Sequence, residues 1–267
     1  MTVLSGDVLA GKIVFISGGT QGIGAAAARA AAAGGAAAVV VTGRRPEVAE
    51  AIIDELDVLG TEPLFVRADV ADVEQAIESV LATVEAFGRV DCVVNAAGFT
   101  ERGSLLDTTP EMFETHVAVN LRAPFFIMQA AVRDMLGRSA PGTIVNVGSI
   151  SQHAGTSYLA PYVAAKGGLA SLTRNVAHAH RSDRIRVNCL NIGWTATEGE
   201  DVVQRRFHGA VDGWLDQAGR DMPAGRLGDP AEIADMIAYL LSDGSGVVTG
   251  SVIDWDQTVI GGQGQLG

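Results

Sequence analysis

The sequence predicts an α/β fold, in which a doubly wound and mainly parallel sheet of seven strands carries helices on both faces. Short apolar runs rich in β-branched residues alternate with alanine-rich segments of helical pattern along the chain. Strands that are apolar throughout and separated by helices are typical of parallel sheets buried on both sides. A length of 267 residues is enough to bury a large core. We therefore expect residues 1–267 to form a single domain.

Local patterns place each element in turn. The expected strands are the apolar runs at 13–17, 38–42, 63–67, 90–95, 142–147, 184–190 and 251–254. Helical patterns fill the intervals at 22–33, 46–58, 72–87, 110–137, 160–180 and 230–242. The last helix has the clearest start, because Asp229, Pro230 and Glu232 supply an N-cap, a first-turn proline and a returning carboxylate.

Residues 194–228 interrupt this alternation between the sixth strand and the last helix. They contain Trp194, Phe207, His208 and Trp214, and they are too long for a plain connection. Insertions at the carboxyl end of a strand often carry binding loops. We predict that 194–228 form a lid over a substrate.

Composition argues against several classes of protein. A formal net charge of -12 disfavours a general nucleic-acid binder, which needs a basic face. Cys92 and Cys189 lie in apolar runs without metal-ligand spacing, so we expect buried thiols and no metal site. Residues 1–7 lack the pattern of a signal peptide, and the apolar run 25–41 is interrupted by Arg29 and a glycine pair. A cytoplasmic protein that does not span a membrane is expected.

A glycine-rich turn follows the first expected strand and opens the first helix. Its residues are Ser17, Gly18, Gly19, Thr20, Gln21, Gly22, Ile23 and Gly24. Glycines permit a tight turn and a close backbone approach, while the helix N-terminus offers unpaired N–H groups to a pyrophosphate. The spacing Gly-x-x-x-Gly-x-Gly in this context predicts nucleotide binding.

Tyr162 and Lys166 form the second chemical signal. They are four residues apart in an expected helix, so phenol and ammonium share one face. The chain has only two lysines, Lys12 and Lys166, which makes this pairing specific. A nearby positive charge favours phenolate over phenol and would lower the pKa of the tyrosine. The pair predicts a proton-transfer site.

Taken together, the residues from about Lys12 to Asp254 resemble the short-chain dehydrogenase/reductase family, in its branch of short single-domain enzymes. Asn120, Ser149, Tyr162 and Lys166 fall where the catalytic residues of the family fall. The positions that match its cofactor-binding residues are Gly18, Thr20, Gln21, Gly22, Ile23, Gly24, Asp69, Val70, Asn95, Ala96, Ala97, Gly98, Gly193, Thr195 and Thr197. Two departures are Ser17 in place of threonine and Ile192 in place of proline.

The resemblance implies a Rossmann-type fold and the interconversion of a secondary alcohol and a ketone with NAD(P). Tyr162 would exchange a proton with the reacting oxygen while Ser149 orients that oxygen. Lys166 would hold the nicotinamide ribose and lower the tyrosine pKa. Asn120 would help to position a water that links Lys166 to solvent, with a purely helix-packing asparagine as the alternative. A catalytically inactive, nucleotide-sensing regulator of the same fold is the alternative function.

The choice of nicotinamide cofactor depends on the residues after the second strand. Gly43 occupies the place where NAD enzymes of the family commonly carry a carboxylate. Arg44, followed by Arg45, could pair with a 2′-phosphate instead. Gln21 stands where many NADP enzymes of the family have a second basic residue, so NADP is preferred and NAD stays open.

Substrate and assembly are the least defined expectations. The pocket candidates follow known site positions and include Phe99 and Arg102 beside the substrate-site residues Thr100, Ser151, His153 and Trp194. Their hydrogen-bonding groups favour a hydroxylated small molecule such as a sugar or polyol. The resemblance also implies a homotetramer, paired through the helices expected at 110–137 and 160–180 and through the last strand.

Overall fold

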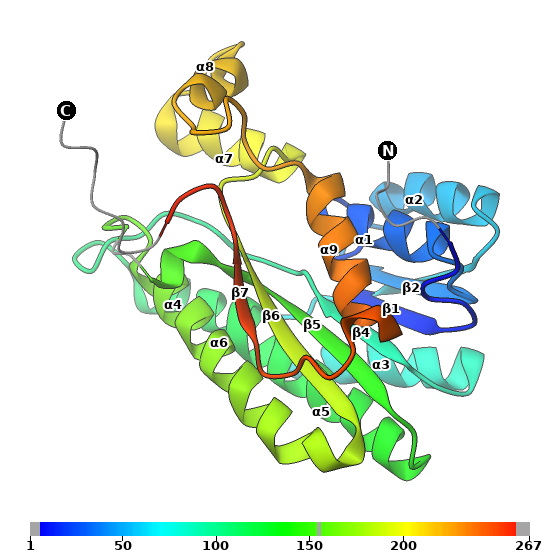
Figure 1. Ribbon diagram of the computed structural model, residues 1–267. Helices are drawn as coiled ribbons and strands as arrows, with labels where there is room; N and C mark the ends of the chain where they lie inside the picture. The colour runs from blue at the N-terminus through cyan, green and yellow to red at the C-terminus, as the bar shows by residue number, and fades with distance from the viewer. Residues whose placement is uncertain (1–5, 154–155, 260–267) are drawn as a thin grey trace.

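Seven strands form one parallel sheet in the order β3-β2-β1-β4-β5-β6-β7 (Figure 1). The strands are β1 (Ile13–Ser17), β2 (Ala38–Gly43), β3 (Glu62–Arg67), β4 (Cys92–Asn95), β5 (Gly142–Ser149), β6 (Ile185–Ile192) and β7 (Val252–Trp255). This computed structural model describes residues 6–153 and 156–259. Most of the N-terminal stretch used to judge secretion lies outside them. The predicted fold class is confirmed.

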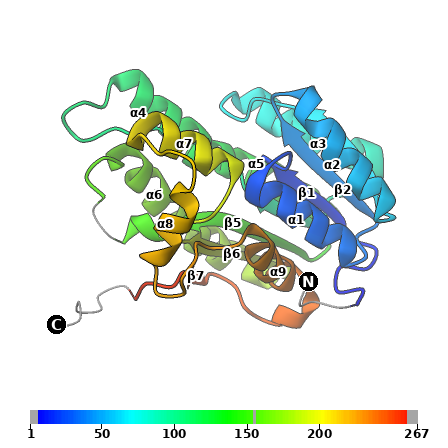
Figure 2. The same ribbon diagram turned by 90° about the horizontal axis from the view of Figure 1, so that it is seen from above.

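Helices cover the sheet on both faces (Figure 2). One layer contains α1 (Gly22–Ala33), α2 (Pro46–Val58) and α9 (Pro230–Leu241), and the other contains α3 (Val73–Phe87), α5 (Ala123–Gly137) and α6 (Ala160–His180). Alternate residues of one strand enter opposite cores: Val14 and Ile16 pack toward α1 and α9, while Phe15 packs toward α3 and α5. None of the helices described is both long and apolar enough to cross a membrane.

The order of the strands places a switch point in the middle of the sheet. β1 pairs with β2 on one side and with β4 on the other, so the chain reverses its direction of travel between β3 and β4. The chain therefore continues from β1 and from β4 to helices on opposite faces of the sheet, and we call the place at the carboxyl edge where the two paths diverge the crevice. Doubly wound sheets bind ligands at this place.

The helix expected at 110–137 is divided. It consists of α4 (Pro110–Val117), a π-helical turn at Ala118–Arg122 and α5. The strand expected from residue 90 begins only at Cys92, because the Val90 N–H donates to the Asp134 carboxylate at 3.1 Å instead of joining the sheet. β5 and β6 each run two residues beyond their expected ends.

Residues 194–228 contain two helices that the sequence pattern did not predict, α7 (Glu198–His208) and α8 (Trp214–Arg220). No side chain of α7 is buried, so α7 lacks the apolar stripe that identifies a helix in a sequence. Its ends are nevertheless well formed, since Thr197 caps the first turn and Gly209 ends the helix with φ +65°. Both helices stand above the carboxyl edge of the sheet (Figure 1).

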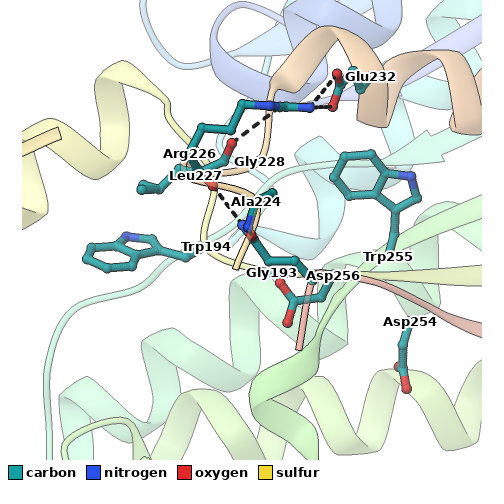
Figure 3. Close-up of a pocket in the computed structure, with 11 residues that line it drawn as sticks. Gly193, Trp194, Ala224, Arg226, Leu227, Gly228, Glu232, Asp254, Trp255 and Asp256 are labelled. Atoms are coloured by element: carbon teal, nitrogen blue, oxygen red, sulfur yellow. Dashed lines mark hydrogen bonds and ion pairs between the residues drawn. The ribbon is translucent and has the colours of Figure 1, made fainter. Parts of the chain in front are cut away.

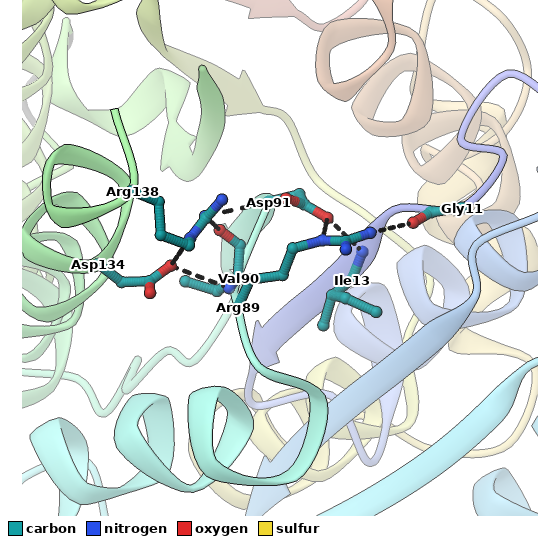
Figure 4. A network of polar contacts seen from close by, with 7 residues as sticks. All are labelled: Gly11, Ile13, Arg89, Val90, Asp91, Asp134 and Arg138. Atoms are coloured by element: carbon teal, nitrogen blue, oxygen red, sulfur yellow. Dashed lines mark hydrogen bonds and ion pairs between the residues drawn. The ribbon is translucent and has the colours of Figure 1, made fainter. Parts of the chain in front are cut away.

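A network of charges ties together the opposite, amino edge of the sheet (Figure 4). The Asp91 carboxylate, just before β4, accepts from the Ile13 N–H of β1 at 3.0 Å and from Arg89 Nε at 2.9 Å. Arg138, at the end of α5, pairs with Asp134 at 2.9 Å and approaches Asp91 to 3.9 Å. This amino-edge network joins two strands and a helix far from the crevice.

Candidate active site

The glycine-rich turn packs against the loop after β4. Gly18 has φ +68°, and a Cβ added there would lie 2.7 Å from the Ala97 Cα. A Cβ at Gly24 would lie 2.1 Å from the Gly18 carbonyl oxygen. Side chains at these two positions would force the turn and the loop apart. The glycines thus bring backbone from β1, α1 and the 95–98 segment into one crevice.

The N-terminus of α1 opens into this crevice. Gln21 is the N-cap residue, but its side chain makes no capping hydrogen bond, and the first turn contains no acidic residue. The first N–H groups of the helix are therefore available to an anion. Gly22 has φ +54°, and a Cβ there would stand 3.6 Å from the Thr197 methyl group. The start of the 194–228 segment thus lies against the turn.

Two arginines follow β2 near this helix end. Arg45 Nη2 donates to Gln21 Oε1 at 2.9 Å, which ties Arg45 to the glycine-rich turn. Arg44 is exposed. A Cβ at Gly43 would lie 2.8 Å from Thr20 Cγ2 and 2.9 Å from Thr20 Oγ1, so the chain passes closely over Thr20 at this point. The surface beside the turn is cationic and free of carboxylates at residues 43–46.

The strands on either side of the crevice end in hydrogen-bonded polar residues. Asn95 Nδ2 donates to Asn146 Oδ1 at 2.8 Å, and Asn146 Nδ2 donates to Thr173 Oγ1 at 2.9 Å, so β4, β5 and α6 are linked in sequence. After β3, the Asp69 carboxylate accepts from the Ala71 N–H at 3.1 Å, and Val70 beside it is buried. Asn95 and Asp69 thereby fix the two loops that flank the glycine-rich turn.

Ser149, Tyr162 and Lys166 meet above the carboxyl end of β5. Ser149 is the last residue of β5, and its Oγ accepts from the Ser151 N–H at 3.2 Å. Tyr162 and Lys166 lie one turn apart at the start of α6, and both are buried. Lys166 Nζ donates to the Val147 carbonyl at 2.7 Å and lies 5.7 Å from the centre of the Tyr162 ring.

Burial governs the acidity of these groups. It raises the pKa of the Tyr162 phenol, against an opposing effect of its hydrogen bond with Ser149. Burial also lowers the pKa of Lys166 to about 8. The sequence led us to expect that Lys166 would lower the pKa of Tyr162. In this structure desolvation has the largest effect on both pKa values, because each group loses water on entering the protein.

Asn120 lies in the π-helical turn beside Tyr162. Its Nδ2 donates to the Phe99 carbonyl at 2.9 Å, and its Oδ1 accepts from the Phe99 N–H at 3.1 Å. π-Helical turns often occur at functional sites. His116, one turn earlier, places Nδ1 3.4 Å from Asn120 Nδ2 and Nε2 3.1 Å from the Glu101 carbonyl. The imidazole ring also contacts Phe99 and Tyr162 edge-on.

The loop after β6 borders a cavity of about 330 Å³ (Figure 3). Gly193 and Trp194 line it, together with Asp254 and Asp256 near β7. Glu232 of α9 also lines this cavity, whereas Ser149, Tyr162 and Lys166 do not. A Cβ at Gly193 would lie 1.7 Å from Asp256 Oδ1, so the wall of the cavity is tightly packed there.

The candidate substrate residues separate into two regions. His153 lies against β7, where its Nε2 is 2.9 Å from Asp254 Oδ1. Trp194 turns toward α7, where its Nε1 donates to Glu200 at 2.8 Å. Thr195 bonds its hydroxyl to the Gly193 carbonyl at 2.9 Å and pairs with Gly228, which closes the base of the 194–228 segment. Across 6–153 and 156–259, no group of three acidic, His or Cys side chains could hold a metal.

Three polar residues of the site were not identified from the sequence, namely His116, Glu200 and Asp254, and His208 was named only as part of the 194–228 segment. His116 precedes Asn120 by four residues, so helical spacing alone could have indicated it. Glu200 and His208 lie on the unpredicted helix α7. Asp254 meets His153 across 101 residues, and no local pattern signals such a contact.

The chain is similar to known proteins along most of its length. A family model described as enoyl-(acyl carrier protein) reductase matches residues 18–258. The short-chain dehydrogenase/reductase FrzI of Cladobotryum and the L-rhamnose 1-dehydrogenase (NAD(P)(+)) of Sphingomonas are each 34% identical to this chain, over 92% of this chain and 95% of their own. A solved variant of actinorhodin polyketide ketoreductase with NADPH superposes with a TM-score of 0.87 at 29% identity, covering 92% of this chain and 96% of that one.

The fold and the site define a nicotinamide-dependent oxidoreductase that acts on CH–OH groups. The chain belongs to the short-chain dehydrogenase/reductase family. The predicted family and the predicted enzyme class are both confirmed.

Proposed function

We propose that this enzyme interconverts a secondary alcohol and a ketone, with Tyr162 as the acid/base. The observation that carries the proposal is the convergence of Tyr162, Ser149 and Lys166 above β5, beside the anion-accepting end of α1. When bound, the nicotinamide supplies or takes up a hydride at the substrate carbon. The protein then has to transfer one proton and to stabilise the negative charge that develops on the reacting oxygen.

Tyr162 exchanges that proton with the reacting oxygen. In the reduction direction its phenol donates, and a raised pKa keeps the donor protonated until the hydride arrives. Ser149 donates a hydrogen bond to the same oxygen and holds it within reach of the phenol. Lys166, with its pKa lowered to about 8, is close to its titration point near neutral pH and can return a proton to Tyr162.

The residues of the crevice fit a dinucleotide. Glycines at positions 18 and 24 leave no room for side chains, and the uncapped N–H groups of α1 suit a pyrophosphate. We assign the adenine end to the loop of Asp69 and Val70 and the nicotinamide end to Gly193, Thr195 and Thr197. Lys166 holds the ribose near the nicotinamide. The floor of the dinucleotide site is formed by Asn95, Ala96, Ala97 and Gly98.

NADP is the preferred cofactor in this proposal, and NAD is the alternative. Arg44 is exposed beside the turn, and Arg45 is held there by Gln21, so two cations stand where a 2′-phosphate would lie. The ketoreductase variant of similar fold is described with NADPH, whereas the Sphingomonas relative is described with NAD(P)(+).

The proposed substrates are hydroxylated small molecules such as sugars or polyols. Support comes from the polar groups of Thr100, Ser151, His153 and Trp194 and from the relative that is named an L-rhamnose 1-dehydrogenase. We also propose a homotetramer in the cytoplasm. Phe125 on α5 is 43% exposed and stacks edge-on against Phe126, which offers an apolar surface to a second copy.

The test is a screen for oxidation and reduction. Ketones, aldehydes and sugars are incubated with NADH or NADPH, alcohols and polyols with NAD or NADP, and the absorbance of the reduced cofactor is followed. We expect turnover of at least one alcohol and ketone pair, and the loss of that turnover in Tyr162→Phe. Failure of every substrate with both cofactors, in a protein that binds either one, would overturn the proposal.

A further inference from the structure

Arg102 joins the loop after β4 to helix α7, directly beside the proton-transfer group. Its Nε donates to His208 Nε2 at 3.0 Å, and its Nη1 donates to the Thr100 carbonyl at 2.9 Å. The guanidinium also lies over the Tyr158 ring, 5.4 Å from the ring centre. The side chain is only 14% exposed, so these contacts fix its position.

Among the residues that the structure describes, one end of this guanidinium makes no hydrogen bond. Arg102 Nη2 lies 3.9 Å from Glu200 Oε1, which is too long for a direct bond. Within the described ranges, no other acceptor is recorded for Nη2. A cation that has lost most of its water usually has bonded partners. The N–H groups of Arg102 Nη2 can therefore donate to a hydrogen-bond acceptor on a bound molecule.

Glu200 faces Arg102 with an open acceptor. Its Oε1 accepts from Trp194 Nε1 at 2.8 Å and from Gln204 Nε2 at 2.7 Å, which holds the carboxylate in place. Oε2 has no recorded hydrogen bond among the residues that the structure describes. The carboxylate is 18% exposed. Arg102 and Glu200 thus offer an open donor and an open acceptor on neighbouring side chains, and we call them the Arg102–Glu200 pair.

The pair lies close to the reacting centre. Gly103 forms a bridge with Leu159, which connects the loop of Arg102 to the start of α6. Tyr158, under the guanidinium, is one turn before Tyr162. Burial is the main cause of the raised pKa of Tyr162; in addition, the charge of Glu200 raises this pKa and the charge of Arg102 lowers it.

We propose that the Arg102–Glu200 pair is a hydroxyl-binding subsite, which recognises a second hydroxyl of a polyol or sugar while Tyr162 acts on the first. This inference rests on the proposed function. A hydroxyl accepts from Arg102 Nη2 and donates to Glu200 Oε2, so it satisfies both open groups at once. Glu200 repels a carboxylate, Arg102 repels an ammonium, and an alkyl group leaves both unpaired. The pair therefore selects a neutral, polyhydroxylated substrate.

The experiment compares substrates that differ by hydroxyl groups alone. Cyclohexanol, cyclohexane-1,2-diol and myo-inositol form one series, and aldopyranoses with their deoxy counterparts form a second. The measured quantity is the ratio of kcat/KM for the more hydroxylated member to that for the less hydroxylated member. We expect a ratio of about ten or more in the wild-type enzyme, in keeping with one charge-assisted hydrogen bond.

Glu200→Gln and Arg102→Leu should each reduce this ratio about tenfold. The matched controls are Glu198→Gln on the same helix and Arg206→Leu, whose guanidinium pairs with Glu101 at the exposed surface. Both controls should keep the wild-type ratio. The affinity for NADPH, followed by fluorescence, checks that each variant is folded. If Arg102→Leu loses that affinity, Arg102→Lys replaces it in the comparison.

Three outcomes would contradict the subsite. Equal kcat/KM values within each wild-type series would overturn it while leaving the proposed oxidoreductase activity intact. Preference for a hydroxy acid, strengthened in Glu200→Gln, would show that the pair binds an anion. Turnover of no alcohol in either series or in the broader screen would remove the proposed function and this inference with it.

Discussion

Asn120 holds Phe99 by both backbone groups, donating to its carbonyl at 2.9 Å and accepting from its N–H at 3.1 Å. The amide thereby fastens the loop after β4 to the π-helical turn. Its Nδ2 also lies 3.4 Å from His116 Nδ1, so both ends of the amide contact protein groups. The contact with Phe99 sets the place of Arg102, three residues beyond Phe99.

His116 should act as a positioning residue for this contact. His116→Phe keeps a ring against Phe99 and Tyr162 but removes both polar contacts of the imidazole. Loss of about two hydrogen bonds should lower the free energy of unfolding by about 1–3 kcal/mol. We expect kcat/KM to fall about tenfold with little change in cofactor affinity. Unchanged kcat/KM would show that His116 is not required to position the contact between Asn120 and Phe99.

The pH dependence of stability should report on the same histidine. Burial lowers the pKa of His116 below its ordinary value of 6.5. The unfolded chain therefore takes up this proton first as pH falls, and the folded state loses stability below about pH 6.5. Denaturant unfolding between pH 5 and 7 should show this loss in the wild-type protein. The loss should be smaller in His116→Phe, whereas equal slopes would contradict the assignment.

Tyr162→Phe should abolish turnover while cofactor binding survives, because only the hydroxyl that carries the proton is removed. Lys166→Ala should weaken both turnover and binding. The matched control is Tyr239→Phe, which alters an exposed tyrosine on α9. If Tyr162→Phe kept more than about a tenth of the wild-type activity, the loss of transition-state stabilisation would be below about 1.4 kcal/mol. Tyr162 would then not be the acid/base.

Lys166→Met should stabilise the fold at pH 7 at the expense of activity. The lowered pKa of about 8, against 10.5 for a free lysine, means that charging the buried amine costs about 3 kcal/mol. Loss of the hydrogen bond from Lys166 to the Val147 carbonyl offsets about 1 kcal/mol of the gain in folding stability. Between pH 8 and 10.5 the unfolded wild-type chain binds more protons than the folded one, so wild-type stability rises with pH. Chemical denaturation should show the advantage of the variant shrinking over that range.

Arg44→Ala should raise KM for NADPH about ten- to a hundredfold and leave KM for NADH nearly unchanged, because one charge-assisted contact with a 2′-phosphate is lost. Added salt should shrink the difference, since the site is exposed. Arg29→Ala, which removes an arginine paired with Glu55 elsewhere on the surface, serves as the control. A wild-type kcat/KM that favours NADH would contradict the NADP assignment. Gly43→Asp is a less direct test, because its Cβ would displace Thr20.

Cofactor binding should slow trypsin cleavage within 194–228. Arg205 pairs with Asp201 and Asp212, and Arg206 pairs with Glu101, so cleavage at either requires α7 to open locally. Closure over cofactor and substrate should make that opening rarer. Arg181, at the far end of α6, is the internal reference. Equal cleavage rates at Arg205 and Arg206 with and without saturating NADPH would argue against a lid.

The parts of the fold with strong local patterns were predictable from the sequence. Helix α6 was expected at 160–180 and is found there, and α1 and α2 also match their predicted bounds. The π-helical turn at 118–122 was not predicted. This turn contains Asn120, whose side chain bonds to the Phe99 backbone. Such a contact between segments far apart in the sequence leaves no local pattern. Helix α7 was missed because only Val202, Val203 and Phe207 are apolar among its residues, too few to give a helical pattern.

The site divides in the same way. The positions of the glycine-rich turn, Ser149, Tyr162 and Lys166 could be read from motifs. The raised pKa of Tyr162 could not, because it depends on how much water three-dimensional packing removes. His153 was expected to face substrate, and its contact with Asp254 could be seen only once β7 was placed beside β6.

The amino-edge network has a consequence for how this enzyme could be re-engineered. Arg89, Asp91, Asp134 and Arg138 fasten the sheet at the edge opposite Tyr162. Segments 99–108 and 194–228 share no residue with these fastenings. Because Arg102 and Glu101 of the first segment contact His208 and Arg206 of the second, exchange of both segments together for those of a relative should leave the scaffold intact and alter only the chemistry it admits. In this sense the sheet is a fixed scaffold, and segments 99–108 and 194–228 are the replaceable parts that determine substrate specificity.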